Sequence, residues 1–191
     1  MDRTITFIRH GKTPGNFNQR YIGVTDEQMT LEGEKDIFAR NYPEAQIVFS
    51  SPLMRCIRTA KIIYPQMKPI IIDELRETNF GSFEGKNYKE LSDNVDYQRW
   101  IESGGQEAFP GGESRQQAID RSLVGFEKLL RASEDYSNIS VVTHGGTIMG
   151  ILSHFFGGEY YSYHIENGEG YTIEVSHDGV FSGLHPRSFL R

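Results

Sequence analysis

Residues 4–11 read TITFIRHG, and this stretch decides the fold that the sequence predicts. Its apolar, β-branched run predicts a buried strand that stops at Arg9, His10 and Gly11. In an open parallel sheet, ligands bind outside the carboxyl ends of the strands, so a cation and an imidazole at this point predict a site. The glycine after His10 would let a bound group approach the backbone without meeting a side chain. The alternative is a strand followed by an ordinary polar loop.

A second occurrence of the pattern favours the site. Residues 139–146 read ISVVTHGG, another short apolar run that ends in His-Gly. If both runs are strands of one parallel sheet, His10 and His144 lie side by side. The pair could also suggest a metal, but no histidine or glutamate follows either one at helical spacing and no cysteine stands beside them. We therefore expect neither a metal nor another cofactor.

Composition sets the class of protein. The chain has 191 residues, 37% of them hydrophobic and 24% charged, which predicts one globular domain over residues 1–191. Its net charge of −6 argues against a nucleic-acid partner. Cys56 is the only cysteine, so no intramolecular disulfide can form. The chain enters a strand at once and contains no apolar run of membrane-spanning length, so we expect no membrane partner and a cytoplasmic location. The sequence holds no signal for the oligomeric state.

Strands and helices alternate along most of the chain. Further strands are expected at 46–49 and 69–72, and terminal strands near 172–175 and 181 at the sheet edge. Helices are expected after Thr30, from Ser51 as N-cap with Pro52 at the first helical position, from a Ser114 and Gln117 capping box, and over 147–155. This order predicts an α/β fold, a three-layer α/β/α sandwich with a mainly parallel central sheet.

Two segments interrupt the alternation. Residues 12–26 lack periodicity and predict a loop across the carboxyl edge of the sheet, where Thr13 and Asn16 can donate hydrogen bonds. Residues 78–112 are rich in glycine and aromatic side chains, with short helical pieces expected at 88–91 and 95–101. This insertion could cap the active site and hold the non-reacting part of a ligand, or its aromatic residues could form a small satellite core.

Four side chains fall at or just beyond the carboxyl ends of expected strands: Arg9, His10, Arg55 and His144. Guanidinium groups match phosphate oxygens bidentately, so this set favours a phosphoryl group. A neutral imidazole can accept the phosphoryl group and form a phosphohistidine. The leaving oxygen needs an acid, and on this argument alone either Glu74 or Glu77, which follow the third strand, would serve.

Four ordered blocks resemble the histidine phosphatase family, also called phosphoglycerate mutase-like. They read RHGKTPGN at 9–16, SPLMRCIRTA at 51–60, ELRETNFGSFEG at 74–85 and VTHGG at 142–146. The resemblance implies that His10 is the phosphorylated nucleophile, Glu77 rather than Glu74 is the proton donor, and His144 stabilises the transferring group. It further implies a set of substrate-binding residues: Arg9, Asn16, Gly23, Arg55 and Gly145.

Within the family, the chain resembles the phosphatase branch more than the mutases. The insertion lacks the adjacent arginine pair expected of a mutase, and PGGES at 110–114 resembles the phosphatases. The resemblance implies hydrolysis of a small phosphomonoester, with α-ribazole phosphate as a candidate substrate. A phosphoglycerate mutase and a catalytically weak phosphate-binding regulatory module are the alternatives.

Overall fold

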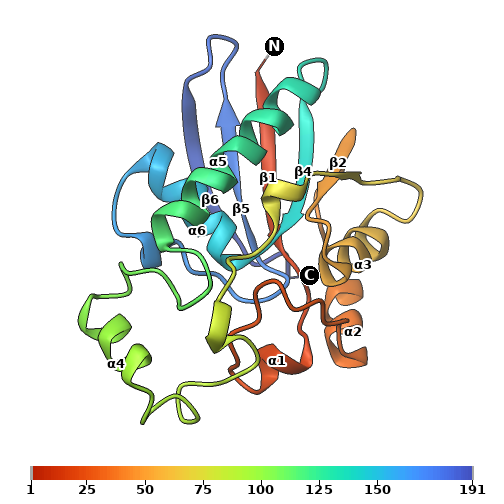
Figure 1. The fold of residues 1–191 in the computed structure, drawn as a ribbon. Coiled ribbons are helices and arrows are strands. Elements are labelled where there is room, and N and C mark those ends of the chain that lie inside the picture. Colours follow the sequence, from red (N-terminus) through yellow and green to blue (C-terminus); the bar gives the residue numbers. More distant parts are fainter. Residues whose placement is uncertain (1, 191) are drawn as a thin grey trace.

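The computed structural model describes residues 2–190, and its centre is one mixed β-sheet (Figure 1). The strands are β1 (Arg3–Arg9), β2 (Ile47–Ser50), β3 (Ile70–Ile71), β4 (Asn138–Thr143), β5 (Gly170–Val175) and β6 (Phe181–Arg187). Their order in the sheet is β3-β2-β4-β1-β5-β6. The first four in this order are mutually parallel, whereas β5 runs antiparallel to both β1 and β6. The predicted α/β class with a mainly parallel sheet is therefore confirmed.

Helices cover both faces of the sheet. On one side lie α5 (Arg115–Ala132) and α6 (Gly145–Phe156), and on the other lie α2 (Leu31–Ala39) and α3 (Met54–Ile63) (Figure 1). Shorter elements are α1 (Pro14–Phe17), α4 (Val95–Glu102) and the 3₁₀ helices η1 (Asp73–Leu75), η2 (Gly81–Phe83) and η3 (Tyr160–Tyr163). This arrangement gives the three layers that the sequence predicts.

The alternation of side chains along the strands supplies a separate core to each face. Phe7 of β1 packs in the larger core with Phe126 of α5. The next residue, Ile8, points the other way into a smaller core with Cys56 of α3. Because the central strands are covered on both faces, their interior residues are apolar or are small hydroxyl side chains that are themselves buried, such as Thr6 and Ser140.

Strands β1 and β4 lie in direct parallel register, with Arg9 opposite Thr143. The backbone N–H of His10 continues the ladder by donating to the Thr143 carbonyl oxygen at 3.0 Å. His10 and His144 therefore leave adjacent strands at the same level of the sheet, as the two His-Gly patterns predict.

Three local expectations were wrong. Helix α3 begins at Met54 with Leu53 as its N-cap, not at Ser51, because the buried Ser51 hydroxyl is within 2.7 Å of a histidine ring nitrogen. Residues 88–91 form turns instead of a helix. The expected loop over residues 12–26 includes the one-turn helix α1, which Thr13 and Asn16 close with a capping box. The capping box of Ser114 and Gln117 at the start of α5 is confirmed.

The insertion at 78–112 has a core of its own. Phe83, Leu91, Tyr97 and Phe109 are buried together, with Trp100 packed against them. These residues form what we call the cap cluster, which is separate from the two cores that flank the sheet. The insertion therefore combines a satellite core with a position beside the carboxyl end of the sheet (Figure 1).

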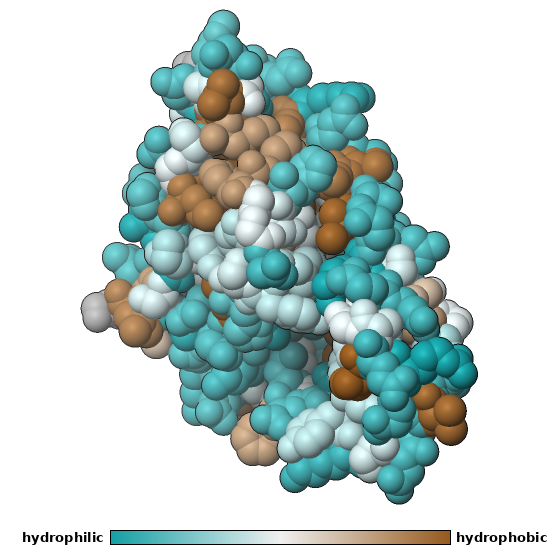
Figure 2. Space-filling view, turned by 90° about the vertical axis from the view of Figure 1, so that its left-hand side faces the viewer, coloured by the Kyte–Doolittle hydropathy of each residue, from teal (hydrophilic) through white to brown (hydrophobic). Residues whose placement is uncertain are grey.

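Apolar side chains reach the surface on one side of the molecule. Figure 2 shows them gathered over α5, α6 and β6, where Phe155 and Phe181 pack at 4.2 Å between ring centroids. These rings extend the larger core outward. Within residues 2–190, none of the helices has both the length and the apolar character needed to cross a bilayer.

Candidate active site

His10 is held as a neutral imidazole with one defined tautomer. The ring is buried, and its Nδ1 lies 2.8 Å from the carbonyl oxygen of Gly11. Since a carbonyl oxygen only accepts hydrogen bonds, Nδ1 carries the proton and Nε2 keeps a free lone pair. Burial, followed by the charges of Arg55 and Arg9, holds the pKa of His10 well below its usual value. Nε2 is therefore nucleophilic at neutral pH.

His144 is the second imidazole, and it is fully buried at the N-cap of α6. Its ring centroid lies 5.2 Å from that of His10, and its Nε2 lies 2.7 Å from Ser51 Oγ. Burial, then the charges of Arg55 and neighbouring groups, also holds the pKa of His144 well below normal. The structure thus brings together two neutral rings, as predicted, and adds a serine hydroxyl that fixes the second one.

Two arginines bring positive charge to the same place. The guanidinium of Arg55 is fully buried and donates to the carbonyl oxygens of Gly23 at 2.7 Å and Thr25 at 2.8 Å. Arg9 donates from Nη1 to the Ile165 carbonyl at 2.6 Å. The Nε–H of each arginine is buried and lacks a hydrogen-bond partner among the described residues. Buried unpaired donors on a cation are costly, so this pair of groups suits an anion.

Glu77 presents its carboxylate to the start of α6. Its Oε1 accepts from the Thr78 N–H at 2.8 Å, and its Oε2 accepts from the Gly146 N–H at 3.1 Å. A Cβ on Gly146 would lie 2.3 Å from Glu77 Oε1, so a glycine is needed for this approach. The charge of Glu77 is also felt at Arg9, where it opposes the lowering of the arginine pKa that burial causes.

A buried ion pair fixes the backbone around Glu77. Arg121 Nε donates to Glu113 Oε1 at 2.7 Å, and the two side chains are only 10% and 18% exposed. The same guanidinium donates to the carbonyl oxygens of Arg76 at 2.7 Å and Glu77 at 3.3 Å. Glu113 Oε2 accepts from the Asn79 N–H at 2.8 Å. Both partners thus hold the segment that carries Glu77.

Glu74 lies elsewhere. Its carboxylate pairs with Lys128, whose hydrogen bond holds the Glu74 pKa below its usual value. Of the two candidate acids, Glu74 and Glu77, it is Glu77 that is bonded to the helix that begins after His144.

The remaining predicted site residues have specific partners. Asn16 Oδ1 accepts from the N–H and hydroxyl of Thr13, both at 3.1 Å, so its amide N–H₂ is the part that can serve an anion. The N–H of Gly23 donates to Glu84, while its carbonyl holds Arg55. Gly145 begins α6 beside Arg9, and a Cβ there would lie 3.4 Å from Arg9 Nε.

Several supporting residues were not found by sequence reasoning. Ser51 was interpreted as a helix cap, although its hydroxyl meets His144. Asn167 lies outside the four family blocks, yet its Nδ2 donates to the His10 carbonyl at 2.9 Å. Arg121 lies outside the four family blocks, and Glu84 lies within the third block without a predicted role. Their long sequence separation from the groups they hold removes any local pattern.

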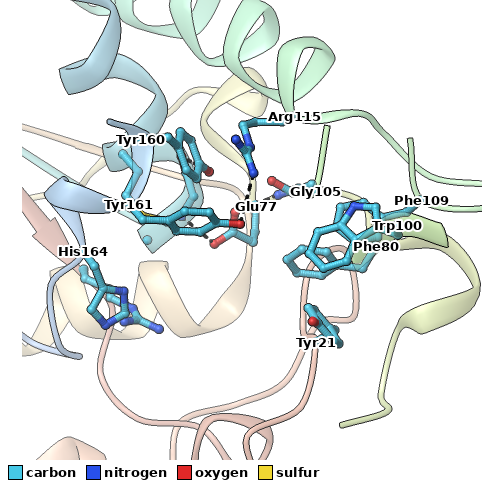
Figure 3. A pocket seen from close by; sticks show the side chains of 15 residues that line it. Tyr21, Glu77, Phe80, Trp100, Gly105, Phe109, Arg115, Tyr160, Tyr161 and His164 are labelled. Atoms are coloured by element: carbon cyan, nitrogen blue, oxygen red, sulfur yellow. Dashed lines mark hydrogen bonds between the residues drawn. The ribbon is translucent and has the colours of Figure 1, made fainter. Parts of the chain in front are cut away.

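A cavity of about 220 Å³ opens beside these residues (Figure 3). Arg9, Glu77, Gly145 and Gly146 line it, together with aromatic side chains. His10, Arg55 and His144 are not among the lining residues, and they are 4%, 0% and 0% exposed. The imidazole pair therefore lies at a deeper level than the cavity. Within residues 2–190, no group of three or more histidine, cysteine or acidic side chains is placed to hold a metal ion.

An open α/β sheet with paired histidines and buried arginines at its carboxyl edge defines a class of phosphate-handling proteins. Residues 5–184 match the histidine phosphatase superfamily (branch 1), and the chain belongs to that superfamily. Its members are phosphatases or mutases. The family resemblance of the sequence is thereby confirmed.

Relatives of both kinds are similar to this chain. A 2,3-bisphosphoglycerate-dependent phosphoglycerate mutase of Cytophaga hutchinsonii is 31% identical over 162 residues, covering 78% of this chain and 76% of the mutase. The adenosylcobalamin/alpha-ribazole phosphatase of Escherichia coli is 29% identical over 160 residues, with 78% and 77% covered. In fold, the alpha-ribazole phosphatase of Shigella flexneri superimposes with a TM-score of 0.83 at 24% identity, covering 96% of this chain and 95% of that one.

Proposed function

We propose that the chain is a metal-independent phosphomonoester hydrolase that acts on a small phosphorylated metabolite through a phosphohistidine. The hydrogen bond from His10 Nδ1 to the Gly11 carbonyl carries this proposal, because it leaves Nε2 unprotonated and pointed away from its own backbone. The depressed pKa of His10 supports the same role. We likewise propose that residues 1–191 are one domain in which 78–112 caps the site, and that the protein acts in the cytoplasm.

In the first chemical step, His10 Nε2 attacks phosphorus and the bond to the leaving oxygen breaks. Glu77 acts as the general acid and gives a proton to that oxygen, so a neutral alcohol leaves. Arg9, Arg55 and the amide of Asn16 neutralise charge on the phosphoryl oxygens. The N–H of Gly145, at the start of α6, and the imidazole of His144 donate further hydrogen bonds to the phosphoryl oxygens.

In the second step, water attacks the phosphohistidine. The Glu77 carboxylate accepts the proton of the water, the P–N bond breaks, and Nε2 recovers its lone pair as inorganic phosphate leaves. Gly23 takes part indirectly, because its carbonyl holds Arg55 while its N–H is bonded to Glu84.

The substrate follows less directly from the site. The name of the E. coli relative makes α-ribazole phosphate a candidate. The mutase relative supports a second candidate, interconversion of phosphoglycerates. Hydrolysis is favoured because apolar and aromatic side chains predominate in the cavity, whereas a mutase must retain an intermediate with two phosphate groups. A weak phosphate-binding regulatory module is disfavoured because nucleophile, acid and both arginines are present together.

Release of inorganic phosphate from p-nitrophenyl phosphate and a panel of metabolite phosphates tests the proposal. His10→Ala should abolish release, whereas His177→Ala, at an exposed turn, should leave it unchanged. Rapid acid-free quenching of the native protein should trap a phosphoenzyme that is acid-labile and base-stable. Near-native turnover by His10→Ala would refute the nucleophile. Faster interconversion of 3- and 2-phosphoglycerate than phosphate release, with 2,3-bisphosphoglycerate as primer, would establish the mutase instead.

A further inference from the structure

The cavity beside Glu77 has two aromatic walls that come from different parts of the fold. One wall belongs to the loop before α2 and to the insertion, and consists of Tyr21, Phe80, Trp100 and Phe109. The other belongs to η3 and consists of Tyr160 and Tyr161. Figure 3 shows the two walls facing each other across the opening, with Glu77 between them at its inner end.

Both walls are uncharged. Burial raises the pKa of Tyr21 and of Tyr160 well above the usual phenol value, so both rings stay neutral at physiological pH. The cap cluster fixes the first wall: Trp100 and Phe109 lie 4.9 Å apart between centroids, and Phe80 and Phe109 lie 5.0 Å apart. A flat ring entering between the walls would therefore meet aromatic faces on both sides, of which the first is fixed by packing.

Arg115 is the cation at the mouth of the cavity, but it is already engaged. Its guanidinium carbon lies 5.0 Å from the ring centroid of Tyr161 and 5.1 Å from that of Tyr160. Its Nη2 donates to the Gly104 carbonyl at 2.9 Å, which ties η3 to the insertion. These contacts hold the Arg115 guanidinium against the rings of the second wall and engage its Nη2.

The charge of Glu77, at the inner end of the cavity, also favours an uncharged ring. Glu77 lines the cavity next to the proposed position of the leaving oxygen. After it has given up a proton, its carboxylate would repel an alcohol that carries a negative charge. A neutral ring suffers no such penalty. The volume of about 220 Å³ lies below the range of drug-sized cavities, about 300–1,000 Å³, and so suits a small ring system.

From these walls we infer that the alcohol half of the substrate carries a flat, uncharged aromatic ring, held between Trp100 and Tyr161 and joined to the phosphate by a short linker. The inference rests on the proposed phosphatase activity and names the substrate class of that site. Each aromatic contact contributes a factor of about 2–12 to affinity beyond its buried area, so two faces, each near the middle of that range, should give at least about tenfold selectivity.

Benzyl phosphate and cyclohexylmethyl phosphate separate ring recognition from chemistry, because both release primary alcohols of similar acidity and size. We expect kcat/KM for benzyl phosphate to exceed that for cyclohexylmethyl phosphate at least tenfold, and 3-phosphoglycerate to be the poorest of the three. Tyr161→Leu should lower the benzyl to cyclohexylmethyl ratio severalfold. Tyr88→Leu is the matched control, because Tyr88 is 50% exposed against 57% for Tyr161 and lies outside the cavity lining.

Binding supplies a readout that does not need turnover. Trp100 is the only tryptophan, so its fluorescence reports occupancy of the wall it forms. Benzyl phosphate should change this fluorescence at concentrations at least tenfold lower than cyclohexylmethyl phosphate. A benzyl to cyclohexylmethyl ratio near one, in turnover or in binding, would overturn the ring inference. If p-nitrophenyl phosphate still released inorganic phosphate, the proposed activity would stand. Absence of phosphate release from every ester would instead overturn the proposed activity.

Discussion

Replacing Gly146 with alanine would displace the proposed acid without touching either histidine. The new Cβ would lie 2.3 Å from Glu77 Oε1 and 3.2 Å from Thr78 Oγ1. The closer atom is the tip of a flexible carboxylate, so Glu77 should rotate away while the backbone stays in place. The same change removes the hydrogen bond from the Gly146 N–H to Glu77 Oε2.

The expected losses differ between catalysis and folding. General acid catalysis contributes about 10²–10⁴-fold, so Gly146→Ala should raise the barrier for alkyl phosphates by about 3–5 kcal/mol. For the free energy of unfolding, alanine gains about 0.4–1 kcal/mol by restricting the unfolded chain. Loss of the hydrogen bond to the carboxylate costs about 1.5–3 kcal/mol. A net destabilisation of about 1–2 kcal/mol is therefore expected, far less than the catalytic effect.

The assay is the dependence of kcat/KM on leaving-group acidity, measured with alkyl, phenyl and p-nitrophenyl phosphates. Gly146→Ala should steepen this dependence, because p-nitrophenolate scarcely needs a proton. Gly145→Ala is the matched comparison, since its Cβ would lie 3.4 Å from Arg9 Nε and would leave Glu77 in place. Any loss from this change should fall equally on all three substrates, so the native slope should persist. Equal losses on alkyl and p-nitrophenyl substrates would refute the placement of Glu77 as the acid.

Three further predictions concern pH, metals and the ion pair. Because His10 and His144 have depressed pKa values in the fold, the unfolded chain binds more protons below about pH 6.5. The free energy of unfolding should therefore fall as the pH decreases below about 6.5, by up to about 1.4 kcal/mol per pH unit for each histidine. The value of kcat/KM should show no loss at about pH 6.5. A fall in kcat/KM near that pH, as expected of a nucleophile with an ordinary histidine pKa, would contradict the depressed pKa of His10. Activity should survive EDTA. Loss of activity in EDTA that an added divalent cation restores would contradict metal independence. Arg121→Met should lower the free energy of unfolding by about 1.5–3 kcal/mol, because the partly buried Glu113 loses its charged hydrogen-bond partner. Chemical denaturation of the single variant and of Arg121→Met/Glu113→Gln should show that the second change recovers part of this loss.

The layers of the fold could be predicted because they depend on local patterns. The runs that end at His10 and His144 are rich in apolar and β-branched residues, as strands covered on both faces usually are. The capping box at Ser114 was recognised because both of its hydrogen bonds join residues three apart. That residues 1–191 form one domain stays a prediction.

The site could be predicted less completely. Motifs identified the groups at strand ends, but the side chains that hold those groups act across long sequence separations. Ser51 illustrates the limit: its position before Pro52 is typical of an N-cap, and only the packing of β2 beside β4 brings its hydroxyl to His144. Local sequence favours the cap, and a tertiary contact overrides it.

The amide ladder between β1 and β4, which runs on to the His10 N–H, has a consequence for local opening of the chain. These hydrogen bonds lie between two cores, so their protons should exchange with solvent only when the whole molecule unfolds. The cap cluster has its own small core, so amides of the insertion should exchange through a cheaper, separate opening. We therefore expect the strand ends that carry His10 and His144 to open only when the whole fold unfolds, and the insertion to open and close many times within the lifetime of one native molecule.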